Sequence, residues 1–132
     1  MIKWLNSLQP FGALLMRLAL GLSMSVHGYE KVIPHGATAH FAHYIVTLGL
    51  PYWLGYISCY TEFIGGILLL LGLLTRLAAA FVAINMFAAL FLVGIHQGFG
   101  IYNYILALAV LATMLVFYGP GKLALDRRLG LS

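Results

Sequence analysis

The chain has 132 residues, of which 63% are hydrophobic and 8% are charged, and its formal net charge is +4. Its mean hydropathy of +1.00 lies far above the range of soluble globular domains, so we expect an integral membrane protein with one domain, residues 1–132. The basic residues are spread along the chain without a large cluster, which argues against a nucleic-acid partner. The single cysteine, Cys59, excludes an intramolecular disulfide and a cysteine-only metal site.

Four apolar segments are each long enough to cross a membrane, since a span needs about 20 mostly apolar residues. They cover residues 11–29, 52–74, 77–96 and 101–118. Pro10 precedes the first segment and is typical of a helix start. Short turns at residues 75–76 and 97–100 separate the last three, and Gly119-Pro120-Gly121 ends the fourth. The sequence therefore predicts an all-α membrane protein, a bundle of four transmembrane helices.

The one long connection, residues 30–51, carries a helical pattern of its own. Apolar side chains recur at Phe41, Tyr44, Ile45 and Leu48, with polar residues between them. This pattern predicts a short amphipathic helix that lies at the membrane interface between the first and second spans.

The distribution of basic residues predicts the orientation of the bundle. With four spans, the N-terminus, the turn at residues 75–76 and the C-terminal tail lie on one side of the membrane. That side has five basic residues, Lys3, Arg76, Lys122, Arg127 and Arg128. The other side has Lys31, so the positive-inside rule predicts that both termini are cytoplasmic.

Glu62 is the first candidate for a functional residue. Between Lys31 and Lys122 it shares the stretch with one other formally charged residue, Arg76. An unpaired charge in hydrocarbon costs several kcal/mol, so we expect Glu62 to face the interior of the bundle as a catalytic or ligand-binding acid. The alternative is a structural acid that is protonated or paired with Arg17.

His27 is the second catalytic candidate, because a rise of about 1.5 Å per residue places it roughly 6 Å outward of Glu62. Arg17 lies roughly 8 Å toward the cytoplasm by the same measure, and both side chains could reach Glu62. We predict an outward-opening polar pocket at this level. The residues expected to bind its substrate or cofactor are Arg17, Lys31, Cys59, Asn85, His96, Asn103 and Tyr104.

Two of these residues have simpler interpretations, and the sequence supports no particular cofactor. Arg17 could extend toward lipid phosphates, and Cys59 could be an ordinary buried cysteine. We predict no metal site, because the histidines of residues 35–43 have no acid among their helical neighbours. A haem between His27 and His96 is disfavoured, because nothing in their spacing supports it.

Together these residues resemble the DoxX family of small bacterial four-helix membrane proteins. The matching features in family order are Arg17 with Gly21, His27-Gly28-Tyr29-Glu30-Lys31, Gly49-Leu50-Pro51, Glu62-Phe63-Ile64-Gly65-Gly66, Gly72-Leu73-Leu74-Thr75-Arg76, Gly119-Pro120-Gly121 and Leu125-Asp126. The resemblance implies a four-helix bundle in the bacterial inner membrane. It links the chain to thiosulfate:quinone oxidoreduction, quinol oxidation and redox-stress complexes, and more distantly to chaperones and cargo receptors. Family members often carry an acid near the start of the fourth span, where this chain has Gly100 and Asn103.

The resemblance and the polar residues favour a quinone-linked redox subunit that binds a hydrophobic ring compound near Glu62. His27 or Lys31 would hydrogen-bond an oxygen of the ring, and Glu62 would exchange protons. The sequence has no flavin, haem or iron–sulfur motif, so a redox partner protein would supply electrons. The alternative is a non-enzymatic protein that binds lipid or a small molecule, or acts as a scaffold or chaperone. A transporter is a third hypothesis and would require a homodimer.

Overall fold

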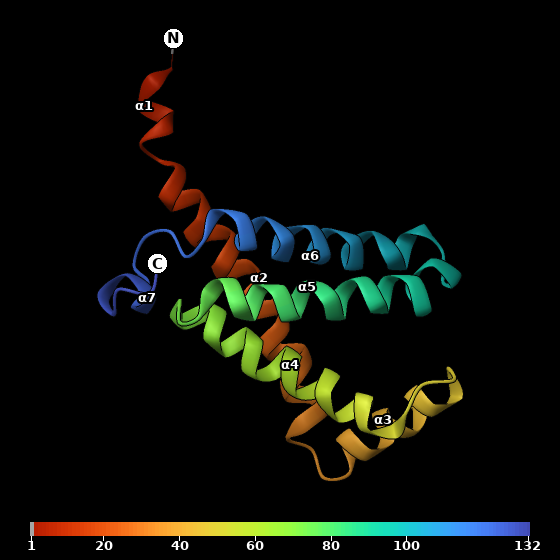
Figure 1. Cartoon of the computed structure of the whole chain (residues 1–132). Helices are drawn as coiled ribbons and strands as arrows, with labels where there is room; N and C mark the ends of the chain where they lie inside the picture. The colour runs from red at the N-terminus through yellow and green to blue at the C-terminus, as the bar shows by residue number, and fades with distance from the viewer. Residues whose placement is uncertain (1) are drawn as a thin grey trace.

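The computed structural model describes residues 2–132, and within that range every regular element is a helix (Figure 1). The elements in chain order are α1 (Lys3–Asn6), α2 (Gln9–Val32), α3 (Ala37–Thr47), α4 (Tyr52–Leu71), α5 (Thr75–Leu92), the 3-10 helix η1 (Gly94–His96), α6 (Phe99–Tyr118) and α7 (Leu125–Arg128). In the described range, four helices are long and apolar enough to span a membrane, namely α2, α4, α5 continued by η1, and α6. The predicted all-α membrane fold with four spans is confirmed.

Several helix ends differ from the predicted ones. The turn expected at residues 75–76 lies at residues 72–74, because α5 already begins at Thr75 and not at residue 77. The second span was expected to reach residue 74, but α4 ends at Leu71 because Gly72 takes the left-handed conformation, with φ of +69°. α2 is longer than expected and runs to Val32, so Lys31 lies in its last turn. The short helix expected between the first two spans is α3, and its placement at a membrane interface stays a prediction.

α2 and α4 lie antiparallel and approach each other closely through glycines. A Cβ added at Gly28 would lie 2.4 Å from the Cα of Phe63, and one at Gly66 would lie 2.4 Å from the backbone nitrogen of Ser25. Such small residues let the backbones of membrane helices come into contact. The two contacts fix how far α2 is shifted along α4, and therefore which side chains of the two helices meet.

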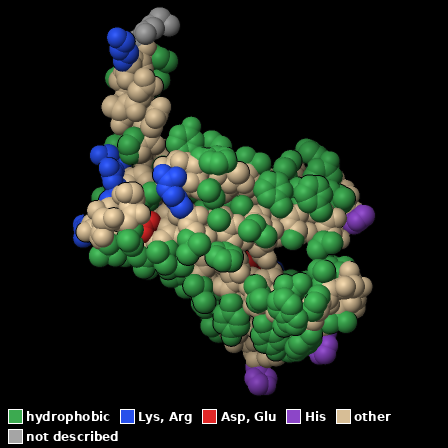
Figure 2. All heavy atoms as spheres, viewed as in Figure 1, with side chains coloured by type: hydrophobic (Ala, Val, Ile, Leu, Met, Phe, Trp, Pro, Cys, Tyr) green, Lys and Arg blue, Asp and Glu red, His purple; other side chains and the backbone are tan. Residues whose placement is uncertain are grey.

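The other two spans, α5 and α6, pack side by side over the pair formed by α2 and α4 (Figure 1). Apolar side chains from all four helices fill the core between them, including Leu20, Met24, Leu69, Val82 and Leu115. Exposed apolar side chains occur on the outer sides of all four spans, and Figure 2 shows many of them on one face. A surface of this kind suits contact with lipid chains and not with water.

The end of the bundle that carries both chain termini is held together by Arg17 and Asp126. Arg17 is 1% exposed, and its Nη2 donates to the carbonyl oxygens of Lys122 and Leu123 at 3.2 and 3.1 Å. Arg17 therefore bonds to the C-terminal segment, and the predicted approach to Glu62 and the extension to lipid phosphates are both wrong. The physical reason is that residues 119–124 fold back over the start of α2, where Lys122 N donates to the Pro10 carbonyl oxygen.

Asp126 caps the N-terminus of α5. Its Oδ1 accepts a hydrogen bond from the backbone nitrogen of Leu74 at 2.6 Å, and its Oδ2 accepts one from Thr75 at 2.8 Å. The first backbone N–H groups of a helix lack partners within the helix and carry partial positive charge. The buried carboxylate of Asp126 satisfies two of them and ties α7 to the turn between α4 and α5.

Candidate functional site

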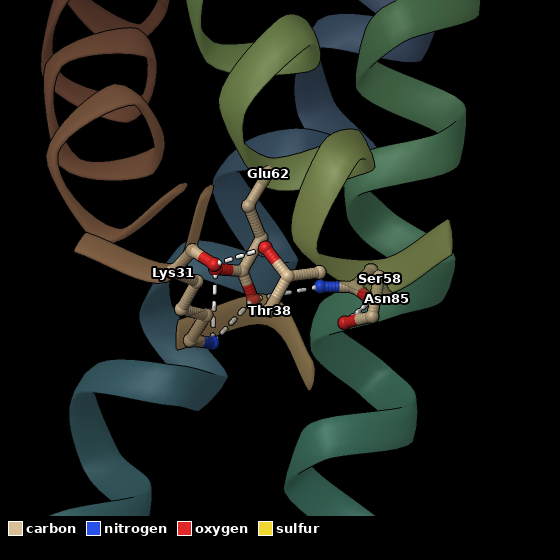
Figure 3. Close-up of polar contacts among 5 residues, drawn as sticks. All are labelled: Lys31, Thr38, Ser58, Glu62 and Asn85. Atoms are coloured by element: carbon tan, nitrogen blue, oxygen red, sulfur yellow. Dashed lines mark hydrogen bonds and ion pairs between the residues drawn. The ribbon is translucent and has the colours of Figure 1, made fainter. Parts of the chain in front are cut away.

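The site is centred on an ion pair between Glu62 of α4 and Lys31 of α2 (Figure 3). The Lys31 ammonium lies 3.1 Å from Oε1 and 3.0 Å from Oε2 of Glu62. Glu62 is 3% exposed, so its carboxylate faces the interior of the bundle as predicted. The side chain of Lys31 keeps 29% of its surface exposed. The negative charge of Glu62 is thus paired with the positive charge of Lys31, whose side chain is still partly exposed at the surface.

A second polar contact to Glu62 comes from α5. Asn85 Nδ2 donates to Glu62 Oε1 at 3.1 Å, and Ser58 Oγ donates to Asn85 Oδ1 at 2.6 Å (Figure 3). The Ser58 bond fixes the orientation of the amide, because Oδ1 must accept while Nδ2 points at the carboxylate. Three helices therefore converge on one carboxylate.

The start of α3 holds Lys31 from the other side. Thr38 Oγ1 donates to the Lys31 carbonyl oxygen at 2.6 Å, which ties α3 to the last turn of α2. The Lys31 ammonium also lies 4.4 Å from the ring centroid of Phe41, a favourable cation–π distance. Lys31 is therefore held between a carboxylate and an aromatic face.

This cluster lines a cavity of about 380 Å³ at the end of the bundle opposite the termini. The cavity is bounded by α3, the first half of α4, the second half of α5 and the start of α6. Its walls are mostly apolar and include the rings of Phe41, Tyr44, Phe81 and Tyr104. Figure 2 shows a hollow on this face between α3 and the turn from α5 to α6, with acidic atoms visible at its inner end.

The geometry suits a small apolar ring with polar substituents. Ligand cavities of about 300–1,000 Å³ usually combine apolar walls with a few fixed polar groups. Here the fixed groups offer an ammonium donor, a carboxylate acceptor and an oriented amide on one wall, and the aromatic rings supply the others. No group of three or more His, Cys, Asp or Glu side chains that could hold a metal ion occurs in residues 2–132.

Four of the nine residues predicted for the site lie together at this cavity, Lys31, Glu62, Asn85 and Tyr104. The other five lie elsewhere. Arg17 is at the opposite end of the bundle, Cys59 is fully buried in α4, and His27 is exposed on α2. His96 is exposed in η1, and Asn103 is exposed on α6, where its amide donates to carbonyl oxygens of its own helix. The predicted pocket around Glu62 is therefore wrong in most of its lining, namely His27, Cys59, His96 and Asn103. The cavity beside Glu62 is lined instead by residues of α3, α4, α5 and α6.

Three contributors to the site were not among the predicted residues. Ser58 could have been predicted from the sequence, since it precedes Glu62 by four residues and therefore lies on the same face of the helix. Thr38 and Phe41 could not have been predicted as site residues, because their contacts with Lys31 depend on how α3 folds back against α2 and α4.

The chain is similar to a known protein family from α2 to η1 and to a bacterial relative over most of its length. The family model described as DoxX matches residues 12–96. The "Putative oxidoreductase CatD" of Bacillus subtilis (strain 168) is 30% identical over 125 residues, which cover 92% of this chain and 90% of the relative. No solved structure matches the chain. The matched residues 12–96 include Lys31, Glu62 and Asn85, the three that form the polar cluster.

Proposed function

The chain belongs to the DoxX family, and from this premise and the geometry around Glu62 we propose that it is a quinone-linked redox subunit of the membrane. The ligand is a quinone-type ring that lies in the cavity beside the Lys31–Glu62 pair. The observation that carries the proposal is the position of Glu62. This buried carboxylate is paired with the Lys31 ammonium and lies at the wall of a cavity that aromatic side chains also line. The name of the Bacillus subtilis relative, "Putative oxidoreductase CatD", is consistent with it.

The polar groups match the chemistry of a quinone. The Lys31 ammonium donates to one ring oxygen, while the rings of Phe41 and Tyr104 flank the ring faces. Reduction of a quinone to a quinol consumes two electrons and two protons. Negative charge develops on the ring oxygens as the electrons arrive, and a fixed ammonium stabilises it.

The protons and electrons have separate sources. Lys31 and Glu62 share a proton-exchange role, since an ammonium donates to the reduced oxygen and the adjacent carboxylate accepts and returns protons. The two electrons come from a redox partner protein. The chain's own part is to bind the ring, orient it and deliver protons at the ring oxygens.

The same proposal includes a location in the bacterial inner membrane with both termini in the cytoplasm. Lys3, Arg76 and the basic residues of 122–128 belong to the end of the bundle that carries the termini, where Figure 2 shows the blue side chains gathered. Lys31 lies at the opposite end, in the last turn of α2. This asymmetry supports the orientation through the positive-inside rule. The cavity then lies toward the outer face of the membrane.

One observation favours a second candidate, a non-enzymatic scaffold or binding protein. Both oxygens of Glu62 are already occupied by Lys31 and Asn85. A carboxylate satisfied in this way can act as an internal strut that joins α2, α4 and α5. In that case Glu62→Gln disturbs assembly, whereas a redox subunit carrying the same change assembles and loses ring binding and turnover.

The test is equilibrium binding of menadione, a quinone without a long tail, to the purified full-length protein in detergent. Asn85→Ala removes a group of the polar cluster, and Asn103→Ala is its matched control, since Asn103 bonds to its own helix. We expect Asn85→Ala to weaken binding by about fivefold or more, as one oriented hydrogen bond is worth about 1 kcal/mol or more. Asn103→Ala should leave binding unchanged.

The same experiment with Glu62→Gln has a control in Glu30→Gln, since Glu30 is exposed one residue before Lys31. A folded Glu62→Gln protein that binds menadione as the wild type does would contradict the proposal. So would wild-type protein that does not bind menadione and does not pass electrons from any donor to it.

A further inference from the structure

A second cavity, of about 350 Å³, lies at the end of the bundle that carries the termini, away from the proposed ring site. It is lined by the start of α2, the first turn of α5, the end of α6 and the segment that follows it, and also by Asn6, Arg127 and Ser132. Three spanning helices end at this level, so the cavity lies where the headgroups of a bilayer begin. Tyr118, the last residue of α6, lines it and suits that depth.

Two guanidinium groups line this cavity, those of Arg76 and Arg127. Arg76 is fixed by its Nη1, which donates to the carbonyl oxygens of Val116 and Phe117 at 2.6 and 3.0 Å. These two bonds leave the Nη2 and Nε donors of Arg76 for another partner. Arg127 bends toward the same cavity, where its Nη1 lies 3.4 Å from the Gly121 carbonyl oxygen.

The side chains that line the cavity carry a net positive charge because the nearby acid is used elsewhere, and Ser132 lies at the same wall. Asp126 precedes Arg127, but both of its oxygens accept hydrogen bonds from the N-terminus of α5, and it is 3% exposed. No Asp or Glu side chain lines the cavity among the residues that the structure describes. The remaining polar side chains at its wall include Asn6 and Gln9, which can donate hydrogen bonds to an anion.

We propose that this cavity binds a phosphate group through Arg76 and Arg127. Paired guanidinium groups are well matched to phosphate oxygens, because each presents donors in a planar fork. The phosphate can belong to an anionic lipid headgroup or be free in solution. The surroundings favour a lipid, since Phe11 and Phe117 are next in the chain to the lining residues Pro10 and Tyr118. They are 47% and 70% exposed and offer surfaces for acyl chains.

The test uses native mass spectrometry of the full-length protein in detergent, with phosphatidylglycerol, phosphatidylcholine or inorganic phosphate as the probe. Arg127→Gln removes one guanidinium, and Arg128→Gln is the matched control, since Arg128 is an exposed neighbour on the same helix and does not line the cavity. We expect the wild type to prefer phosphatidylglycerol over phosphatidylcholine. Arg127→Gln should weaken phosphatidylglycerol binding by about fivefold and Arg128→Gln by less than about twofold, as expected for one exposed charge-assisted contact.

The outcomes separate the two sources of phosphate from a nonspecific surface charge. Displacement of phosphatidylglycerol by inorganic phosphate, with the same dependence on Arg127, supports a phosphate site open to free anions. Binding that requires the acyl chains supports a lipid site. Equal losses in Arg127→Gln and Arg128→Gln, or equal binding of the two lipids by the wild type, would overturn the proposal.

Discussion

The ion pair between Lys31 and Glu62 predicts a measurable coupling energy. At about 3 Å and an effective dielectric constant near 20, the Coulomb attraction is about 5 kcal/mol before desolvation is subtracted. Lys31→Met leaves the carboxylate of Glu62 buried and unpaired, so we expect it to lower the free energy of unfolding by about 3 kcal/mol. Glu62→Gln should cost about 2 kcal/mol, since the ammonium of Lys31 still reaches solvent.

The double variant distinguishes a true pair from two independent side chains. Removal of both charges should cost about as much as Lys31→Met alone, which gives a coupling energy of about 2 kcal/mol. The assay is unfolding by increasing SDS in a fixed second detergent, followed by circular dichroism. Glu30→Gln, an exposed acid in the same turn, should change stability by less than about 0.5 kcal/mol. Additivity of the two single variants within about 0.5 kcal/mol would refute the pairing.

Three further predictions test the helix contacts and the capping carboxylate. Gly28→Ala should prevent the close contact of α2 with Phe63 and lower the melting temperature strongly, whereas Gly12→Ala should not, because a Cβ at Gly12 meets nothing within 4 Å. A thermal melt in detergent that shows equal stability for the two variants would contradict this account. Asp126→Asn should cost about 1–2 kcal/mol in the SDS titration, because the N-terminus of α5 loses a negative cap, and an unchanged titration would show that the cap is dispensable. Ser58→Ala should weaken menadione binding less than the loss of Asn85 does, because it frees the amide to rotate without removing it, and the larger loss in Ser58→Ala would point to direct contact with the ring.

The fold could be predicted because its signals are local. Each span is a continuous apolar segment, and its ends carry glycine or proline, as at Gly72 and Gly119. The burial of Glu62 was also predictable, since an acid in an apolar segment must avoid lipid. The errors in the span ends are small. A left-handed glycine stops α4 earlier than hydropathy does, and α2 continues past its expected end to Val32.

The partners of Glu62 were harder to predict, because they depend on contacts between helices. Depth along the membrane places Arg17 and His27 at plausible distances from Glu62, but depth says nothing about the direction in which a side chain points. Arg17 donates to the carbonyl oxygens of residues 122 and 123. Hydropathy does not predict where this C-terminal segment lies relative to α2. His27 faces outward on α2, one residue before the glycine that packs against Phe63.

That glycine explains why Lys31, and not His27, meets the carboxylate. Gly28 packs on the backbone of Phe63, so the face of α2 that contains residue 28 is the face that touches α4. One helical turn takes that face from residue 28 to residues 31 and 32, and on α4 the residue beside Phe63 is Glu62. Lys31 is therefore placed over Glu62 by the same contact that brings the two backbones together. A displacement of α2 along α4 would break the helix contact and the ion pair together, so a Gly28→Ala protein that remained folded should lose menadione binding even though its polar cluster is unchanged in sequence.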